Sequence, residues 1–172
     1  MKLLIDADFI VYKCCAAAES EIDWGDDVIT VVSRFSEAYR SVERDIEKIR
    51  SEFFNAEPVL FFSDSKNFRK KINELSAFYK VVRIDELEAD DAMGIFATHE
   101  PGNIIVSPDK DLRQIPGDLY NLKDPVETIT SEDAWRWFLI QSMAGDMTDG
   151  YSGVPGIGVK RADALLESNG CK

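Results

Sequence analysis

Short apolar runs alternate with helical patterns along this chain, and this alternation constrains its fold more than any other feature. The apolar runs, each of strand length, cover residues 2–6, 58–63, 79–84, 103–107 and 119–122. Helical patterns fill the gaps at 9–18, 27–54, 87–98 and 131–143. Because strands that alternate with helices form mainly parallel sheets covered on both faces, the sequence predicts an α/β fold.

Two of the helical patterns carry specific expectations. In 27–54, apolar residues recur at spacings of three and four, which predicts one long amphipathic helix, and residues 23–26 are expected to supply a turn and the helix cap. In 131–143, Ser131 is the expected N-cap, and the aromatic residues are expected on the buried side.

Length and charge narrow the class of protein. The chain has 172 residues and a mass of 19.4 kDa, which is about one ordinary domain. Its 32 acidic and 20 basic residues give a net charge of -12, which argues against a protein that coats nucleic acid through bulk charge. A nuclease is still compatible with this charge, because phosphate contacts need only a local basic strip.

The start of the chain and its cysteines argue against other classes. Residues 1–6 reach a charge too early for a signal peptide, and no apolar run is long enough to span a bilayer. We therefore expect a soluble, cytoplasmic protein without membrane contact. Cys14, Cys15 and Cys171 make no zinc-binding spacing with His99, so they are expected to be reduced thiols.

Acidic residues gather where the predicted strands end. They form five groups: Asp6 with Asp8; Asp64; Glu88, Asp90 and Asp91; Asp109 with Asp111; and Asp146 with Asp149. Each group alone has an ordinary explanation, because Asp is common in turns and at helix caps. The joint pattern favours a site, because the carboxyl ends of parallel strands meet on one rim, where ligands bind.

A metal site is the simplest explanation of such a rim. Crowded carboxylates repel one another unless cations lie among them, and their oxygen atoms suit magnesium. Two divalent ions about 4 Å apart can clamp a scissile phosphate, one activating water and the other stabilising the leaving oxygen. The sequence therefore predicts hydrolysis of a phosphodiester without a His, Cys or Ser nucleophile.

Basic residues complement the predicted metal site. Residues 65–71 follow the second acidic strand end, so Arg69 is expected beside the metal site, where its guanidinium would hold a phosphate. Lys66 and Lys70 are candidate DNA contacts, and a solvated helix face explains them equally well. Lys13 lies in the first predicted helix and is expected to face the same rim.

A glycine-rich turn follows the last acidic group. Its Gly153, Gly156 and Gly158 allow backbone amides to approach a phosphate, and Lys160 and Arg161 begin the helix behind them. Such a turn, preceded by acids and followed by a basic helix start, is expected to bind DNA.

The composition changes near Gly145, which suggests a boundary between two modules. We place a nuclease domain at 1–144 and a DNA-binding element at 145–172. The chain stops at Lys172, soon after the helix that follows the glycine-rich turn.

The motifs together resemble those of the flap endonuclease and 5′-3′ exonuclease family. They are Leu-Ile-Asp6-Ala-Asp8, Phe-Ser-Asp64 with Phe-Arg69, Glu88-Ala-Asp-Asp91, Ser-Pro-Asp109-Lys-Asp111-Leu, and Gly-Asp146-Met-Thr-Asp149 followed by Gly-Val-Pro-Gly-Ile-Gly158. The amino-acid sequence from Asp146 to Ser152 is most similar to that of the exonucleases of short-tailed bacteriophages. The resemblance covers nearly the whole chain.

The resemblance implies a PIN-like domain with a C-terminal helix-three-turn-helix element and an activity in DNA replication. It implies a monomer that cleaves DNA at 5′ ends, flaps or nicks, in the host cytoplasm if the protein is encoded by a phage. Two Mg²⁺ or Mn²⁺ ions would serve the reaction, and a K⁺ ion would lie at the glycine hairpin. Carried over by motif, the metal shell comprises Asp6, Asp64, Glu88, Asp90, Asp91, Asp109, Asp111, Asp146 and Asp149, with Asp8 outside this set. Lys13 and Arg69 would contact the scissile phosphate.

One departure from the family concerns the arch over the site. Relatives carry a longer basic stretch between the Phe-Arg motif and the next strand, whereas here only residues 73–77 intervene. Either the arch is very short or the sequence lacks residues there. Relatives also continue beyond the position of Lys172, so the C-terminal element is expected to be truncated. Both gaps argue against threading of a free 5′ end and against full activity. The sequence leaves open whether exonuclease or flap endonuclease activity dominates.

Other classes share part of the pattern. Haloacid-dehalogenase-like magnesium phosphatases also pair Asp-x-Asp after a first strand with later acids, but those stand four residues apart, whereas Asp146 and Asp149 stand three apart. That family does not predict the glycine hairpin, and neither does a PIN-type ribonuclease. A non-catalytic DNA-binding relative would be expected to lose acids that this chain keeps.

Overall fold

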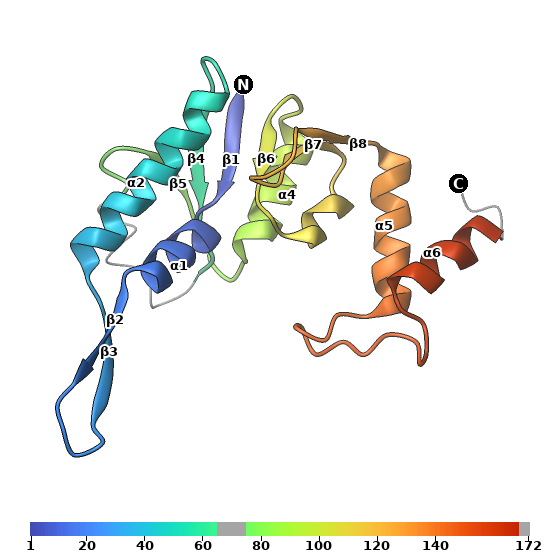
Figure 1. Cartoon of the computed structure of the whole chain (residues 1–172). Helices are drawn as coiled ribbons and strands as arrows, with labels where there is room; N and C mark the ends of the chain where they lie inside the picture. The colour runs from blue at the N-terminus through green and yellow to red at the C-terminus, as the bar shows by residue number, and fades with distance from the viewer. Residues whose placement is uncertain (65–74, 169–172) are drawn as a thin grey trace.

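A six-stranded sheet forms the centre of the molecule (Figure 1). The computed structural model describes residues 1–64 and 75–168. In spatial order the strands are β5 (Lys80–Val82), β4 (Glu57–Phe61), β1 (Lys2–Asp6), β6 (Ile104–Val106), β7 (Gly117–Tyr120) and β8 (Glu127–Ile129). Neighbouring strands are parallel except β7 and β8. The predicted mainly parallel sheet is therefore confirmed.

Helices cover both faces of this sheet. α1 (Ala7–Ala17) and α2 (Phe35–Glu52) pack on one face, and α4 (Ala89–His99) packs on the other. Side chains of β1 alternate between the two cores, because successive residues of a strand point to opposite faces. Leu3 lies in the core with α1 and α2, and Leu4 lies in the core with α4.

The carboxyl ends of three adjacent strands lie on one rim because β4, β1 and β6 are parallel. β1 ends at Asp6, β4 leads into Ser63 and Asp64, and β6 leads into Ser107 and Asp109. The expectation that the acids at the ends of these strands lie on the same rim of the sheet is confirmed.

The single long helix expected over 27–54 is wrong in its first part. Residues Glu19–Asp23 and Ile29–Ser33 form an antiparallel hairpin, β2 and β3, and α2 begins only after its N-cap, Arg34. The turn expected at 23–26 is therefore part of the hairpin and is not a helix cap.

Two local features favour this hairpin. Asp26 and Asp27 adopt left-handed φ values of 51° and 60°, and the Val28 N–H donates to the Gly25 carbonyl at 3.0 Å, which closes the turn. The next residues are the β-branched run Val-Ile-Thr-Val-Val, which prefers a strand. Apolar residues in this run also recur at helical spacing, which explains the incorrect helix.

Beyond β8, two helices pack against each other. They are α5 (Ser131–Ala144) and α6 (Val159–Ser168), and their small core contains Ile140, Ala162 and Leu166. The domain boundary between residues 144 and 145 and the helix-three-turn-helix assignment stay predictions. Within the described residues, no helix combines the length and apolar character needed to cross a membrane.

Two predictions for α5, its N-cap residue and the burial of its aromatic residues, differ from the structure. Thr130, not Ser131, is the N-cap: its Oγ1 accepts from the Asp133 N–H at 3.1 Å, and Asp133 Oδ2 accepts from the Thr130 N–H at 3.2 Å. Trp135 and Phe138 stack on each other and are 59% and 42% exposed. The aromatic residues of α5 therefore do not all lie on its buried side.

Candidate metal centre

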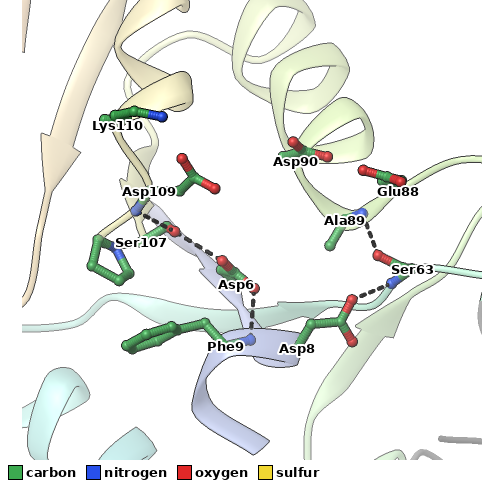
Figure 2. A pocket seen from close by; sticks show the side chains of 11 residues that line it. Asp6, Asp8, Phe9, Ser63, Glu88, Ala89, Asp90, Ser107, Asp109 and Lys110 are labelled. Carbon is green, nitrogen blue, oxygen red and sulfur yellow. Dashed lines mark hydrogen bonds between the residues drawn. The ribbon is translucent and has the colours of Figure 1, made fainter. Parts of the chain in front are cut away.

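Five carboxylates line a cavity of about 630 Å³ at the carboxyl rim of the sheet (Figure 2). They are Asp6, Asp8, Glu88, Asp90 and Asp109, and we call them the inner pocket. They come from three separate parts of the chain: the junction of β1 with α1, the start of α4, and the segment after β6. The parallel sheet thus brings together acids that lie far apart in the sequence.

A buried serine joins the acids at the ends of β1 and β6. Asp6 caps α1, because its Oδ1 accepts from the Phe9 N–H at 3.0 Å. Its Oδ2 accepts from the Ser107 hydroxyl at 2.8 Å, and Ser107 Oγ accepts from the Asp109 N–H at 3.1 Å. Because Ser107 is only 1% exposed, this arrangement fixes Asp6 relative to Asp109.

A second serine joins Asp8 to the start of α4. Asp8 Oδ2 accepts from the Ser63 N–H at 2.9 Å, and Ser63 Oγ accepts from the Ala89 N–H at 3.0 Å. The other oxygen, Oδ1 of Asp8, is buried and has no hydrogen-bond partner among the described residues. A buried carboxylate oxygen without a donor is unfavourable unless a cation or a donor lies beside it.

The inner pocket has the electrostatics of crowded, unneutralised acids. Burial is the main cause of the raised pKa of Asp6, and hydrogen bonds from Phe9 and Ser107 act in the opposite direction. The charge of Asp90 is the main cause of the raised pKa of Glu88, and burial raises the pKa of Asp90 itself. Among the described residues, no lysine or arginine forms an ion pair with any of the five acids.

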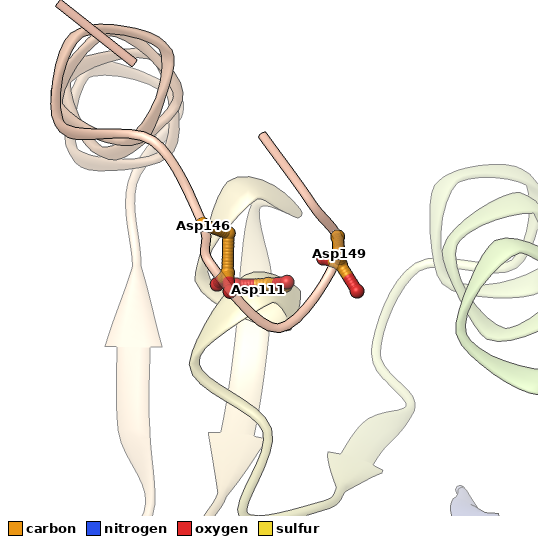
Figure 3. A group of neighbouring side chains, drawn as sticks. All are labelled: Asp111, Asp146 and Asp149. Carbon is orange, nitrogen blue, oxygen red and sulfur yellow. The ribbon is translucent and has the colours of Figure 1, made fainter. Parts of the chain in front are cut away.

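Three further carboxylates form a second group (Figure 3). Asp111, Asp146 and Asp149 each place one oxygen within 4.8 Å of the others, and we call them the outer triad. Asp111 lies in the short helix η2 (Lys110–Gln114), and the other two lie in the loop after α5. The charge of Asp149 contributes to the raised pKa of Glu88, so the two groups adjoin.

A lysine neutralises part of the outer triad. Lys110 Nζ forms an ion pair with Asp111 at 3.2 Å and a second ion pair with Asp146. The hydrogen bond from Lys110 lowers the pKa of Asp146 to about 2, and the same bond raises the pKa of Lys110. Lys110 also lines the inner pocket, so its ammonium group lies between the two acidic groups.

Local contacts hold the outer triad in place. The Thr148 N–H donates to Asp146 Oδ1 at 2.8 Å. On the side of α5, Gln141 donates to Asp111 through its side-chain amide, and Gln114 donates to Gln141 Oε1 at 2.8 Å. These contacts connect η2, α5 and the loop that carries Asp146.

The close approach of two glycines shapes this loop. Gly145 and Gly153 have φ values of +77° and +63°, and a Cβ on Gly153 would lie 2.5 Å from the backbone of Ala144 and Gly145. Gly153 therefore has a structural role here, in addition to the DNA contact predicted for it. Gly156 has a φ of +75°, which favours glycine. Gly158 does not have a positive φ, and a Cβ on it would meet no atom within 4 Å.

Seven of the nine acids predicted as metal ligands lie in these two groups; Asp64 and Asp91 lie in neither. Asp64 Oδ1 forms an ion pair with Arg83 at 2.7 Å, and its Oδ2 accepts from the Glu86 N–H at 3.2 Å. Asp91 is exposed on α4. Both keep a predicted role in the metal shell, without a place in either group.

The predicted basic residues are less well placed. Lys13 Nζ forms an ion pair with Asp45 of α2 at 2.6 Å and does not line the inner pocket. Lys66, Arg69 and Lys70 lie outside the described residues, as does the beginning of the expected short arch. Lys160 and Arg161 are exposed in the first turn of α6, as expected for residues that contact DNA.

Sequence reasoning missed four residues of the site. Asp8 was left outside the metal shell, although it lines the inner pocket. Lys110 had a signal in the sequence, because it stands between Asp109 and Asp111 in the Asp-Lys-Asp motif. Two serines, Ser63 and Ser107, orient the acids and had only a weak signal, their position just after a buried strand.

Comparison with known proteins reveals two related phage enzymes. The chain is 30% identical to the exodeoxyribonuclease of Enterobacteria phage T3 over 91% of its own length and 63% of the relative's length. It is 29% identical to the exonuclease of Escherichia phage T7, over 95% of its own length and 66% of that relative. The chain thus spans about two thirds of the length of each. No protein-family model matches it.

Solved structures with the same fold come from phage T5. The T5 5′-exonuclease with bound zinc ions superposes with a TM-score of 0.65 at 12% identity, over 97% of this chain and 74% of that one. The T5 flap endonuclease in a pseudo-enzyme-product complex with DNA and metal ions gives a TM-score of 0.64 at 13% identity, over 96% and 74%. The chain is thus similar in sequence to these phage exonucleases and shares the fold of the T5 5′-exonuclease.

Proposed function

We propose that the chain is a metal-dependent nuclease that hydrolyses DNA phosphodiester bonds at 5′ ends or flaps. The observation that carries this proposal is the inner pocket with the adjoining outer triad, on the carboxyl rim of a parallel sheet. The phage T3 and T7 relatives named as exonucleases support it, and so do the T5 structures with metal ions and DNA.

The residues fit divalent cations. Among the described residues, a buried oxygen of Asp8 has no hydrogen-bond donor. Burial raises the pKa values of Asp6 and Asp90, and the charge of Asp90 raises that of Glu88, so a bound cation would stabilise the ionised form of all three. All donors in both groups are carboxylate oxygens, which suit Mg²⁺ and Mn²⁺ rather than zinc.

We assign one ion to the inner pocket and one to the outer triad. Asp6, Asp8, Glu88, Asp90 and Asp109 would hold the first, and the three acids of the outer triad would hold the second. When bound, the pair supplies an activated water and stabilises the leaving oxygen of the phosphodiester. Asp64 and Asp91 would support hydrated ions from outside the two groups.

Basic residues of the chain would hold the phosphate. Lys110 lines the inner pocket, so its ammonium group becomes available to a phosphate there once it leaves Asp146. Lys13 would first have to leave Asp45. Arg69 remains the predicted contact to the scissile phosphate, because a guanidinium binds phosphate oxygens with two hydrogen bonds.

The segment between α5 and α6 is the proposed binding site for duplex DNA. Gly156 and Gly158 have open space where a Cβ would stand, so a phosphate can approach their backbone amides. Lys160 and Arg161 lie in the first turn of α6, where the helix N-terminus favours anions. A K⁺ ion at this turn is part of the same proposal.

The proposed substrate is DNA with a 5′ end, flap or nick, cut by a monomer in the host cytoplasm. Incubation of the protein with 5′-flapped, nicked, blunt and single-stranded DNA, with Mg²⁺ or with excess chelator, tests this proposal. We expect cleavage from the 5′ side that requires the metal ion. Full cleavage in chelator, or hydrolysis of a phosphate monoester with no cleavage of DNA, would contradict it, and the second result would favour a phosphatase.

A further inference from the structure

The β2–β3 hairpin stands apart from the rest of the molecule. It forms a two-stranded sheet of its own and projects beyond α1 and α2, at the end of the molecule away from α6 (Figure 1). Every residue from 21 to 32 is exposed. The inner pocket and the outer triad contain no residue of the hairpin. The proposed nuclease site therefore does not explain this element.

The hairpin exposes an unusual amount of apolar surface. Its large apolar side chains, each between 36% and 68% exposed, are Ile22, Trp24, Val28, Ile29, Val31 and Val32. A lone two-stranded hairpin is only marginally stable in water. Contiguous exposed apolar surface marks sites where soluble proteins bind partners. Covering this hairpin would therefore stabilise it.

One face of the hairpin combines acids with apolar residues. Directly opposite residues of an antiparallel pair share a face, and here Glu21 pairs with Val31 and Asp23 pairs with Ile29. On this face the carboxylates of β2 form one row and the apolar side chains of β3 form the other. Val31 and Ile29 are each 59% exposed.

The opposite face carries an ordered aromatic residue. Ile22 pairs with Thr30, and the indole N–H of Trp24 donates to the Thr30 hydroxyl at 2.8 Å. This bond holds the Trp24 ring across the two strands near the turn. An exposed tryptophan with a fixed orientation is typical of residues that contribute strongly to a protein interface.

The charge of the hairpin selects the class of partner. Residues 19–33 contain no lysine or arginine, and their acids are Glu19, Glu21, Asp23, Asp26 and Asp27. Such a surface repels the phosphates of nucleic acid and of anionic lipids. The same face of a second copy would repel it too, because a symmetric contact would oppose like charges. A basic protein surface is complementary to it.

We propose that this hairpin is a docking surface for a second protein, one that presents lysine or arginine side chains beside an apolar strip. The basic side chains would contact Glu21 and Asp23, and the apolar strip would pack on Ile29 and Val31. None of these four residues belongs to the inner pocket or the outer triad.

A displayed library of random linear peptides, selected on the full chain, tests the proposal. Selected peptides should combine Lys or Arg with apolar residues. Their affinity should fall about tenfold or more for the variant Ile29→Ser with Val31→Ser, and for Glu21→Lys with Asp23→Lys. Glu132→Lys, an exposed charge reversal in the first turn of α5, is the matched control and should bind like the parent.

A charge swap makes the test specific. A selected peptide in which Lys is replaced by Glu should regain affinity for the Glu21→Lys, Asp23→Lys variant. Peptides without basic residues, or peptides that bind both hairpin variants like the parent, would overturn the proposal. Loss of duplex DNA binding in the hairpin variants would assign the surface to nucleic acid, and a changed sedimentation coefficient would assign it to a second copy; either result also overturns it.

Discussion

The inner pocket and the outer triad are both built from carboxylates, but they differ in their ion pairs and in the direction of their pKa shifts. In the inner pocket, no described lysine or arginine pairs with the acids, and the pKa values of Asp6, Glu88 and Asp90 are raised. In the outer triad, Lys110 forms ion pairs with two acids, and the pKa of Asp146 is lowered to about 2. Burial and neighbouring charges therefore decide the pKa of each of these carboxyl groups, although nearly all of them are aspartates.

This difference has a consequence for metal binding. A divalent ion entering the inner pocket relieves repulsion among the acids and meets no competing cation from the described residues. Lys110 also lines the inner pocket, but its ion pairs are with Asp111 and Asp146, so only an ion entering the outer triad must displace its ammonium group from a carboxylate. We therefore expect the inner pocket to bind metal more tightly than the outer triad.

The largest expected effect comes from removing a charge in the inner pocket. Asp90→Asn or Asp109→Asn keeps the side-chain shape but removes an anionic ligand, so cleavage of 5′-flapped DNA should slow by more than about 100-fold. Binding of the same DNA in excess chelator should change little, because a carboxylate does not attract phosphate without a metal ion.

Glu57→Gln is the control for this loss. It removes one exposed carboxylate at the start of β4, at the opposite end of the strand from the acidic rim. Its cleavage rate should match that of the parent. If either inner-pocket variant cleaved DNA at the parent's rate, the proposed site would be misplaced.

Changing Lys110 sharpens the comparison between the two groups. Lys110→Met leaves Asp111 and Asp146 without their ammonium partner, so the affinity of the outer triad for Mn²⁺ should rise about fivefold, the size expected for an exposed ion pair. Calorimetric titration in an Asp90→Asn, Asp109→Asn background, which weakens the inner pocket, reports mainly on the outer triad. Lys123→Met, at another exposed lysine, is the control, and equal affinities in the two variants would refute competition by Lys110.

The raised pKa values predict how stability depends on pH. The folded protein holds protons on Asp6, Glu88 and Asp90 more tightly than the unfolded chain does, so stability falls as the pH rises through these pKa values. In chelator, the midpoint of thermal unfolding should therefore rise as the pH is lowered from neutral through these pKa values. Excess Mg²⁺ should remove this gain, and a gain of equal size in Mg²⁺ would argue against metal at these acids.

The smallest effect on function is expected outside both acidic groups, at the proposed binding site for duplex DNA between α5 and α6. Gly158→Ala adds a Cβ into open space without backbone strain, so the melting temperature should stay unchanged. Affinity for duplex DNA should fall about threefold if a phosphate approaches this backbone. Lys160→Ala should lower affinity similarly and also reduce the salt dependence. Unchanged binding in both variants would make this turn a helix connector only.

The fold was largely predictable because its strands are buried runs of strand length. β1, β4 and β6 were expected, because each lies in a short apolar run between two helical patterns and is buried in the structure. The β2–β3 hairpin was not predictable from periodicity, because Val28, Val31 and Val32 fit helical spacing as well as a strand. Its exposure to water also removes the buried face that pattern analysis relies on.

Most acidic residues of the site could be predicted from the sequence, but their ion pairs with basic residues could not. Parallel strands bring Asp6 and Asp109 together, as expected from their places at strand ends. The ion pair that holds Asp64 to Arg83, and the contact of Lys110 with Asp146, depend on how loops fold back on the rim. No residue spacing encodes such contacts, so only the structure separates the inner pocket from the outer triad.

An anomalous-scattering map from crystals of the protein soaked in Mn²⁺ tests the central claim most directly. The account predicts one peak among Asp6, Asp8, Glu88, Asp90 and Asp109, and a second peak among Asp111, Asp146 and Asp149, with Lys110 displaced from Asp146. An inner pocket without a peak, or a peak in the outer triad with Lys110 still bonded to Asp146, would contradict it.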